Sequence, residues 1–540
     1  MANPLLERIR AAIIGADEVL PGPYGPRRVT YADHTASGRA LTMVEDAIRA
    51  HVLPWYANTH SESTATARQT TRFREEARAA IHRAVGGTAE HVVVFCGAGC
   101  TGAVTKLRGV LGDLRGAVVF VGPYEHHSNE LPWRESAAEV VAIPTDTDGR
   151  IDLAALEAAL RAYADRPLRI GTFSAASNVT GMLSDTAAVS RLLRSYGALS
   201  CWDYAAAGPY LSIDMADKDA VFLSPHKFLG GPQTPGVLVA RRGLFRNQVP
   251  TVPGGGVVAY VHANGQWYLD DPVAREEGGT PAIVESIRAG LAFALRDAVG
   301  VQTITAMDDA YCRRAIARWR TNPNLELLGN PDAPRLPIVS FRVRHQGRLL
   351  HHHFVVTLLS DLFGIQARGG CSCAGPYGHS LLGIEADRAA AIVNQVGQGY
   401  FGAKPGWARV NLHWSMPEST VDYIIEAVDL VARYGHRLLP DYRFDPASGH
   451  WSHVRWPTTP PRGFDDLFAT VLNGVSPMDA RPAAGVAATA LAAGYLTYAR
   501  SVFDAAPDVV DGSDNGLPPE FERLRDYHLP PSCVPTPVSA

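Results

Sequence analysis

The segment SPHKF at residues 224–228 contains a lysine, Lys227, between an apolar run and the Gly-rich segment GGPQTPG. A lysine that forms a Schiff base must be held beside a carbonyl compound, with its amine partly desolvated. The end of a strand supplies a rigid position, and the glycines permit close approach. Because an average lysine is a solvated surface residue, Lys227 becomes a catalytic candidate only through the residues that accompany it.

Other strand ends carry groups that suit an aromatic, phosphorylated carbonyl cofactor. Asp203, in CWDYAAAG, ends the preceding apolar strand, where a carboxylate can pair with a protonated pyridine nitrogen. The turn FCGAGCTGAV (95–104) follows a strand and opens a helix, and the free N–H groups of such a turn bind phosphate. Taken singly, Asp203 is a typical helix or turn cap, and the Gly-rich turn is typical of many tight turns.

Two more strand ends complete the set. Asn178, in SAASNVTG, can donate to a phenolic oxygen, and His126, in EHHSN, can stack on the face of a ring. The ordinary alternative for EHHSN is a surface histidine pair or, with Glu125, a metal site, but no further ligands stand at coordinating spacing. Together the five strand ends predict an enzyme that binds pyridoxal 5′-phosphate (PLP), with Lys227 as the Schiff-base lysine and no metal.

Alternating apolar runs and amphipathic stretches between residues 31 and 242 supply the elements that position these groups. Near-continuous apolar strands separated by helices favour a mostly parallel, doubly wound sheet with both faces covered, an α/β fold. We expect helices at 152–164 and 185–197, with Asp152 and Asp185 as N-caps. The expected strands are 91–95, 117–121, 140–143, 168–173, 198–202, 220–224 and 237–240.

The texture changes to α+β beyond about residue 296, with helices expected at 302–320, 351–362, 385–400 and 418–434, and strands at 338–343 and 408–412. We therefore expect a large PLP-binding domain at 29–295, a smaller domain formed by 1–28 and 296–442, and a C-terminal extension at 443–540. Helical pieces at 463–473 and 484–503 lie within that Pro-rich extension.

The composition is that of a soluble globular enzyme: 46% of the residues are hydrophobic, 19% are charged, and the net charge is −4. That balance gives no electrostatic reason to expect nucleic acid or an anionic membrane as partner. The first twenty residues lack the pattern of a secretory signal, and the apolar stretch Pro482–Ala499 is mostly Ala and Gly. Seven cysteines are too sparse for a disulfide framework, so a cytoplasmic location is expected.

The motifs together resemble the class V aminotransferase fold (PLP-dependent transferase, fold type I), in its cysteine desulfurase and selenocysteine lyase branch, over roughly residues 29–440. The resemblance rests on YADHTASG, EHHSN, SNVTG, WDYAAAG, SPHKF, EGGTP and RGGCSCAGP. It implies the Schiff-base role for Lys227, the ring-nitrogen partner role for Asp203, the stacking role for His126 and the phenolic-oxygen contact for Asn178. The implied phosphate ligands are Ser224, His226 and the backbone of Gly99, Cys100 and Thr101, with Thr280 reaching the cofactor of the other subunit of a homodimer.

Two further positions of the resemblance concern the reaction. Arg409, in ARVNLHW, matches the arginine that binds the substrate α-carboxylate, for which a guanidinium fork is suited. RGGCSCAGP (368–376) resembles a catalytic loop in which Cys373, rather than Cys371, is the nucleophile. A thiolate is the reactive form, so this loop should be exposed and close to positive charge such as Arg368.

The expected reaction is the removal of sulfur from L-cysteine, or of selenium from selenocysteine, giving alanine and a persulfide on Cys373 that an acceptor protein could collect. The chain departs from the family pattern at Ala206, at Gly99–Cys100 and at Cys371. An epimerase, an aminotransferase or a C–S lyase on the same fold therefore stays an alternative. A non-catalytic scaffold is disfavoured by the intact Lys227, Asp203 and His126, and a metal hydrolase is disfavoured because HHH at 351–353 lacks a coherent ligand set.

Overall fold

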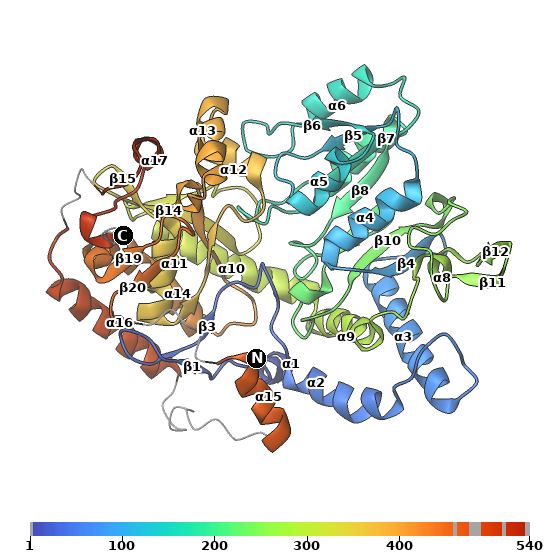
Figure 1. Ribbon diagram of the computed structural model, residues 1–540, viewed down its shortest axis with the longest axis horizontal. Helices are drawn as coiled ribbons and strands as arrows, with labels where there is room; N and C mark the ends of the chain where they lie inside the picture. The colour runs from blue at the N-terminus through green and yellow to red at the C-terminus, as the bar shows by residue number, and fades with distance from the viewer. Residues whose placement is uncertain (1–3, 457–461, 475–487, 510–514, 535–540) are drawn as a thin grey trace.

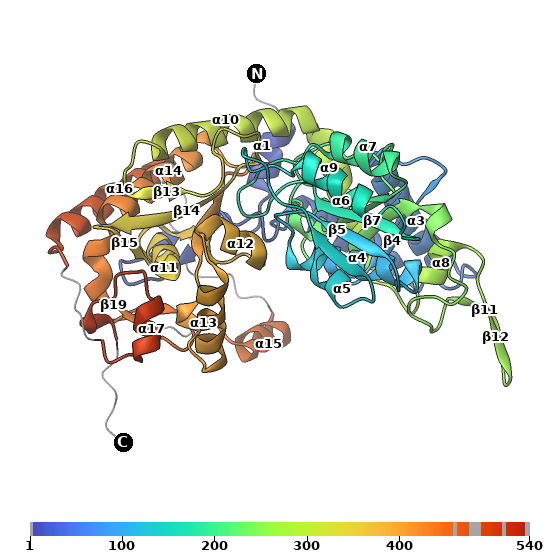
Figure 2. The same ribbon diagram turned by 90° about the horizontal axis from the view of Figure 1, so that it is seen from above.

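The computed structural model describes residues 4–456, 462–474, 488–509 and 515–534, and it has two lobes that lie side by side (Figure 1). The first lobe contains the elements between about residues 42 and 299, and the second contains most of the elements that follow. Helix α10 (Val301–Trp319) runs along both lobes in the view from above (Figure 2). Each lobe has a core around its own sheet.

Seven strands of the described chain form the first sheet, in the order β4-β10-β9-β8-β7-β5-β6. Neighbouring strands among β5 to β9 pair in parallel, whereas β10 is antiparallel to both β4 and β9. The bounds are β4 His91–Cys96, β5 Val118–Val121, β6 Glu139–Ala142, β7 Arg169–Ser174, β8 Leu199–Asp203, β9 Ala220–Leu223 and β10 Gly236–Arg241. The predicted α/β fold with a mostly parallel sheet is confirmed.

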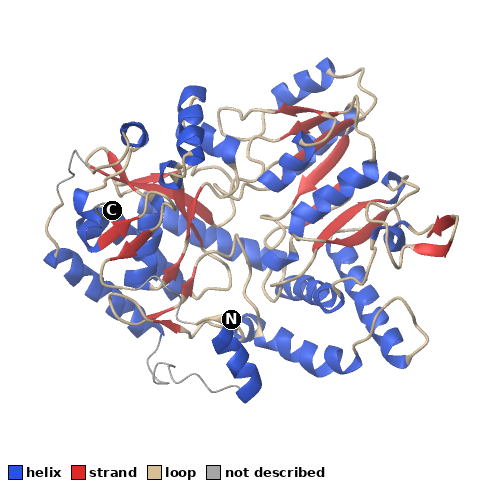
Figure 3. Ribbon diagram, viewed as in Figure 1, coloured by secondary structure: helices blue, strands red, loops and turns tan. Residues whose placement is uncertain are grey.

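Helices cover this sheet, as Figure 3 shows by the red strands set between blue helices. Asp152 and Asp185 cap α6 (Leu153–Ala162) and α7 (Thr186–Ser195) as expected, because each side chain accepts a hydrogen bond from the third residue after it. Apolar side chains along the helices pack on strands that are almost wholly buried. The helices of this lobe are α2 Thr42–Ala47, α3 Ala65–Ala84, α4 Gly99–Leu111, α5 Leu131–Arg134, α6 Leu153–Ala162, α7 Thr186–Ser195, α8 Pro272–Glu276 and α9 Ile283–Val299.

The second lobe is built on an antiparallel sheet whose described strands run β13-β14-β18-β17, with β15 paired to β14. The strands are β13 Leu325–Leu327, β14 Ile338–His345, β15 Arg348–Leu350, β17 Arg368–Gly370 and β18 Trp407–Asn411. The helices are α11 His352–Phe363, α12 Gly375–Leu382, α13 Ala386–Gly397 and α14 Glu418–Tyr434. The α+β texture expected beyond residue 296 is observed.

The N-terminal segment joins the two lobes. Leu6 and Ile9 of α1 (Pro4–Ala11) are buried in the core of the first lobe. Further along, β1 (Val19–Leu20) pairs with β2 (Arg27–Arg28), and β3 (Thr30–Tyr31) pairs in parallel with β16 (Ile365–Gln366) of the second lobe. The residues that follow Tyr31 of β3 therefore lie at the boundary between the lobes, where the candidate site is found.

Two features lie outside the elements that the sequence patterns predicted. A hairpin, β11 (Val258–His262) and β12 (Gly265–Tyr268), projects from the first lobe in Figure 2. In the extension, β19 (Tyr442–Phe444) pairs with β20 (Trp451–His453), and α15 (Phe464–Asn473), α16 (Ala488–Ala505) and α17 (Pro519–Leu524) follow. Helices α15 and α16 match the expected helical pieces, except that residues 484–487 lie outside the described residues. Among the described helices, none has the length and apolar character needed to cross a membrane.

Candidate active site

A cavity of about 240 Å³ opens at the carboxyl ends of the strands of the first sheet, where the second lobe faces them. Of the predicted site residues, all except Thr280 line this cavity. They are Gly99, Cys100, Thr101, His126, Asn178, Asp203, Ser224, His226, Lys227, Arg368, Cys373 and Arg409. Groups that lie more than 300 positions apart in the sequence thus meet in one hollow.

Lys227 and Asp203 sit at the ends of neighbouring parallel strands, β9 and β8. Lys227 ends the 3₁₀ turn Pro225–Lys227, and burial lowers the pKa of its ammonium, an effect that the nearby Asp203 carboxylate opposes. Burial raises the pKa of Asp203, while the N–H of Ala205, 2.6 Å from its Oδ1, and the positive Lys227 lower it. The pair therefore places an amine with a lowered pKa beside a buried carboxylate.

The turn that opens α4 forms an anion cradle. Ser224 Oγ accepts a hydrogen bond from the N–H of Cys100 at 2.9 Å, which fixes the hydroxyl against the first turn of the helix. Gly99 has a φ of 53°, and a Cβ built on it would stand 2.8 Å from His226 Cε1 and 2.9 Å from Ser224 Oγ. Only glycine leaves this space open, and N–H groups of a helix's first turn point toward it.

Cys100 also links the cradle to the carboxylate, because its thiol donates to Asp203 Oδ1 at 3.3 Å. Burial, followed by the proximity of Asp203, raises the pKa of this thiol well above its usual value. Cys100 is therefore a neutral hydrogen-bond donor here rather than a nucleophile.

His126 and Asn178 face the cavity from the loops after β5 and β7. His126 Nδ1 accepts from the N–H of Ser128 at 3.1 Å, and burial lowers the pKa of the imidazole to about 3, so the ring is neutral. Asn178 Nδ2 donates to the carbonyl of Ser372 at 2.8 Å, whereas its buried Oδ1 has no hydrogen-bond partner among the described residues. The amide of Asn178 thus reaches the loop that carries Cys373.

Arg409 is held by a residue to which the sequence motifs gave no role, Asp33. Arg409 Nη2 donates to Asp33 Oδ1 at 2.8 Å, and Arg368 Nε donates to Asp33 Oδ2 at 2.9 Å. Arg409 Nη1 donates to the carbonyl of Asn178 at 2.8 Å. Burial lowers the pKa of Arg409, and Asp33 opposes that shift. The Asp33 carboxylate thus orients both arginines. In the sequence, Asp33 was marked only by its place in the motif YADHTASG.

The loop with Cys373 lies between β17 and α12, and a second residue without an assigned role, His127, fixes it. The N–H of His127 donates to the carbonyl of Cys373 at 2.9 Å, and His127 Nε2 accepts from the N–H of Gly375 at 2.9 Å. Cys373 is exposed and lines the cavity, as expected for a reactive thiol near Arg368. Cys371 is exposed but is not part of the lining.

Thr280 lies away from the cavity of its own chain. It is exposed, and its hydroxyl accepts a hydrogen bond from Asn58 Nδ2 at 3.2 Å. Thr280 is therefore neither a core residue nor in contact with the cavity of its own chain. It leaves the expected contact to a second subunit as an untested prediction.

The donor set and shape of the cavity fit PLP. The cradle at Gly99 and Ser224 suits a phosphate, Asp203 stands where a ring nitrogen needs a carboxylate, and Lys227 supplies an amine. The neutral His126 can cover a ring face, and the unpartnered amide oxygen of Asn178 marks an unfilled polar position.

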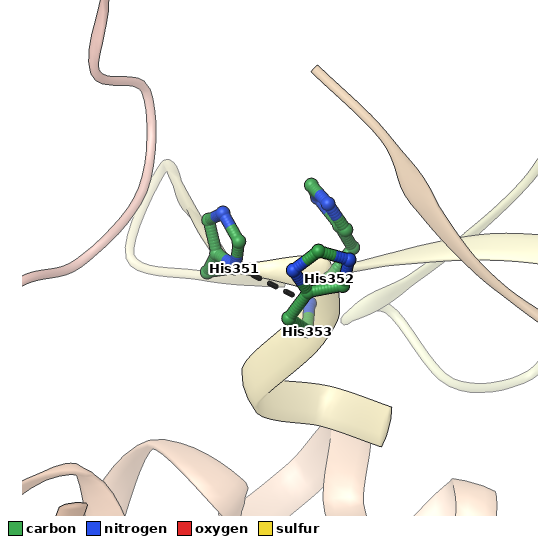
Figure 4. A group of neighbouring side chains, drawn as sticks. All are labelled: His351, His352 and His353. Carbon is green, nitrogen blue, oxygen red and sulfur yellow. Dashed lines mark hydrogen bonds between the residues drawn. The ribbon is translucent and has the colours of Figure 1, made fainter. Parts of the chain in front are cut away.

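Three consecutive histidines form a separate group at the start of α11 (Figure 4). Their potential ligand atoms lie within 4.8 Å of one another. The rings of His351 and His352 are stacked, with centroids 4.2 Å apart. His351 Nδ1 accepts from the N–H of His353, and His353 Nδ1 is 2.8 Å from the carbonyl of Gly449. One nitrogen of His351 and one of His353 are thus engaged by backbone groups, whereas the buried His351 Nε2 has no hydrogen-bond partner among the described residues. The His351 ring also packs against Phe444 and Tyr527 of the extension.

The chain is similar to known proteins over most of its length. The family model described as aminotransferase class-V matches residues 30–422. A probable cysteine desulfurase of Staphylococcus epidermidis is 27% identical over 390 residues, which is 71% of this chain and 91% of that protein. A cysteine desulfurase of Dickeya dadantii is 29% identical over 380 residues, which is 69% of this chain and 88% of that protein.

Solved structures share the fold. The apo cysteine desulfurase of Thermococcus onnurineus superimposes with a TM-score of 0.65 at 23% identity, covering 80% of this chain and 99% of that one. A cysteine desulfurase of Escherichia coli, in an S-sulfonic acid form, superimposes with a TM-score of 0.63 at 22% identity, covering 79% and 98%.

Proposed function

Because the chain belongs to the class-V aminotransferase family, we propose that it is a PLP-dependent cysteine desulfurase, which takes sulfur from L-cysteine or selenium from selenocysteine. The observation that carries the proposal is that the exposed thiol of Cys373 lines the same cavity as Lys227 and Arg409. An amine, a carboxylate-binding arginine and a thiol are the groups that this reaction requires. An aminotransferase, an epimerase or a C–S lyase would use the first two and would have no need of Cys373.

PLP, when bound, supplies an electron sink that stabilises negative charge at the substrate Cα. Lys227 would hold the cofactor, Asp203 would pair with the ring nitrogen, and His126 would cover the ring face. Asn178 would meet the phenolic oxygen with one N–H of its amide, while the other N–H stays on the Ser372 carbonyl. Ser224, His226 and the turn at Gly99–Thr101 would bind the phosphate.

The substrate would be oriented by its carboxylate. Arg409 has further N–H groups besides those that bind Asp33 and the Asn178 carbonyl. A guanidinium can bind a carboxylate by donating two parallel hydrogen bonds to it. Arg368 adds positive charge at the more open side of the cavity. Lys227 would remove the proton from Cα, which its lowered pKa favours because a neutral amine is the base.

Cys373 would act as the thiolate nucleophile on the substrate's sulfur. The bond between Cβ and sulfur breaks, a sulfur–sulfur bond forms at Cys373, and the carbon skeleton takes up protons and leaves as alanine. The enzyme keeps a persulfide. His127 and Asn178 serve this step by holding the carbonyls of Cys373 and Ser372, so that the thiol stays at the cavity.

We also propose a homodimer and a cytoplasmic location. Thr280, exposed and remote from its own cavity, would contact the phosphate bound by the other subunit. Seven free cysteines, two of them exposed, favour a compartment that keeps thiols reduced. A thiol-bearing acceptor protein would then collect the sulfur.

The test is to reconstitute the protein with PLP, to add L-cysteine, and to measure alanine and sulfide for the wild type, Lys227→Ala and Cys373→Ser. We expect the wild type to release both products, Lys227→Ala to lose the visible absorbance of lysine-bound PLP together with activity, and Cys373→Ser to keep the absorbance and lose sulfur release. Sulfur release that survives Cys373→Ser would instead favour a C–S lyase.

A further inference from the structure

The loop between β17 and α12 presents two thiols rather than one. Of the seven cysteines, five are buried, and the two exposed ones, Cys371 and Cys373, are separated only by Ser372. They differ in what they face, because Cys373 lines the cavity and Cys371 does not. A thiol that is reachable from solvent therefore stands directly beside the proposed nucleophile.

The backbone of this loop is held in a tight turn. The N–H of Ala374 donates to the carbonyl of Cys371 at 3.2 Å, and both Ser372 and Cys373 have positive φ, 53° and 54°. The Ser372 carbonyl is bound by Asn178 and the Cys373 carbonyl by His127. Two residues apart, the Cα atoms of the cysteines are separated by at most about 7 Å. The two thiols are therefore near neighbours in one turn.

Building on the function proposed above, we propose that Cys371 is a relay thiol that takes the terminal sulfur from the Cys373 persulfide. The Cys371 thiolate attacks the terminal sulfur, a new sulfur–sulfur bond forms at Cys371, and the bond to the Cys373 sulfur breaks. Cys373 leaves as a thiolate, and the transferred sulfur keeps its proton. The exchange is neutral in electrons and needs no oxidant or reductant.

Attack on the terminal sulfur suits the fixed loop better than formation of a disulfide. A disulfide requires its two Cβ atoms about 3.5–4.5 Å apart with a defined torsion, a demand that transfer of the terminal sulfur does not make. A persulfide extends the Cys373 side chain by about 2 Å, the length of a sulfur–sulfur bond. That extra length brings the terminal sulfur toward Cys371 while the hydrogen bonds from Asn178 and His127 stay in place.

The relay separates the two tasks of the site. Cys373 is returned to its thiolate form at the cavity and can attack the next substrate. Cys371 offers the sulfur outside the cavity, where a thiol acceptor can take it without entering the site that holds substrate.

The experiment uses the full-length protein reconstituted with PLP and mixed with a stoichiometric amount of L-cysteine. The mixture is quenched with an alkylating agent at increasing times, and fragmentation of the peptide with both cysteines locates the extra sulfur by mass. We expect the sulfur first on Cys373 and later on Cys371. Cys371→Ser and Cys371→Ala should give the same first burst of alanine, keep all the sulfur on Cys373, and turn over several-fold more slowly with a thiol acceptor.

The outcomes are distinct. Sulfur that stays on Cys373 in the wild type, with unchanged turnover in Cys371→Ser, overturns the relay, as does a Cys371–Cys373 disulfide with released sulfide. Sulfur found on Cys371 in a Cys373→Ser variant would mean that Cys371 attacks the substrate directly, which also contradicts the relay. Absence of alanine from the wild type refutes the proposed function itself and is recognised by that product alone. A retained PLP absorbance and alanine burst in the Cys371 variants show that the loop is intact.

Discussion

At the scale of single residues, the site depends on positions where one atom more or less changes what can bind. Gly99 leaves the space between His226 and Ser224 open, and the buried Arg409 donates hydrogen bonds to two partners, Asp33 and the Asn178 carbonyl. Such positions are sensitive because the surrounding groups are fixed by other contacts and cannot give way.

Gly99→Ala should abolish or strongly weaken PLP binding. The added Cβ would meet His226 Cε1 at 2.8 Å and Ser224 Oγ at 2.9 Å, and the φ of 53° strains any residue with a Cβ by roughly 1–2 kcal/mol. Titration of the apoprotein with PLP, followed by absorbance, measures the loss. Gly97→Ala is the matched control, because a Cβ there meets nothing within 4 Å. Equal PLP affinity in both variants would contradict the cradle.

Arg409→Lys should raise the KM for L-cysteine by about tenfold to a hundredfold, since a charge-assisted hydrogen bond contributes about 1.5–3 kcal/mol. A lysine keeps the charge but loses the planar fork that a carboxylate needs. The absorbance of bound PLP should not change. Arg368→Lys provides the comparison, because the Arg368 side chain is 48% exposed against 4% for Arg409, and exposed charges contribute little. A larger effect at Arg368 would reverse the assignment of the clamp.

At the scale of elements, the cavity is made by loops that follow strands, and the second lobe contributes one further loop whose position depends on the first. His127, after β5, is bonded to that loop through both its backbone N–H and its imidazole. The loop between β17 and α12 is therefore fixed by His127, which lies more than 240 residues earlier in the chain.

His127→Ala should slow sulfur extraction several-fold and leave PLP binding unchanged. It removes the acceptor of the Gly375 N–H, and a hydrogen bond of this kind contributes about 1 kcal/mol. The kcat for alanine formation and the PLP absorbance are measured side by side. His379→Ala, on the adjoining helix α12, is the control. A variant that loses PLP together with activity would show that His127 supports the first lobe rather than the loop.

Much at this scale could be predicted from the sequence, because local patterns determine it. Each strand expected between residues 91 and 240 is observed within two residues of its predicted ends, since apolar runs and turn residues are local signals. The partners Asp33–Arg409 and His127–Gly375 could not be predicted. They are 376 and 248 positions apart, and nothing in the local pattern of either residue specifies the other. The resemblance identified Arg409 and Cys373, but the residues that hold them became visible only in three dimensions.

At the scale of the whole molecule, the extension is part of the second lobe rather than an appendage. Phe503, Phe521 and Leu529 are buried in the core of that lobe, and Tyr527 forms a parallel bridge with Leu349 of β15. The match to the family ends at residue 422, so these buried side chains belong to a part of the chain that the family pattern does not cover. The contact between lobe and extension also includes the stacked imidazoles of His351 and His352.

The buried histidines should make the folded chain sensitive to acid. Burial lowers the pKa of His34 to about 3 and the pKa values of His351, His352 and His413 well below the usual value. In the unfolded chain the same groups titrate near pH 6.5. The unfolded state therefore binds more protons below about pH 6.5, and the free energy of unfolding decreases as the pH falls through that value, whereas these groups contribute no pH dependence above it.

Each such histidine should lower the free energy of unfolding by up to about 1.4 kcal/mol for each pH unit below pH 6.5. Denaturant unfolding at several pH values measures the slope for the wild type, for His352→Gln and for His60→Gln, an exposed position. The His352 variant should show a smaller slope, by about one proton, whatever its stability at neutral pH, because glutamine does not titrate. The His60 variant controls for the loss of an imidazole at the surface. Equal slopes in all three proteins would mean that His352 is protonated in the folded chain, and the packing of the extension against the second lobe would then have to tolerate a buried charge.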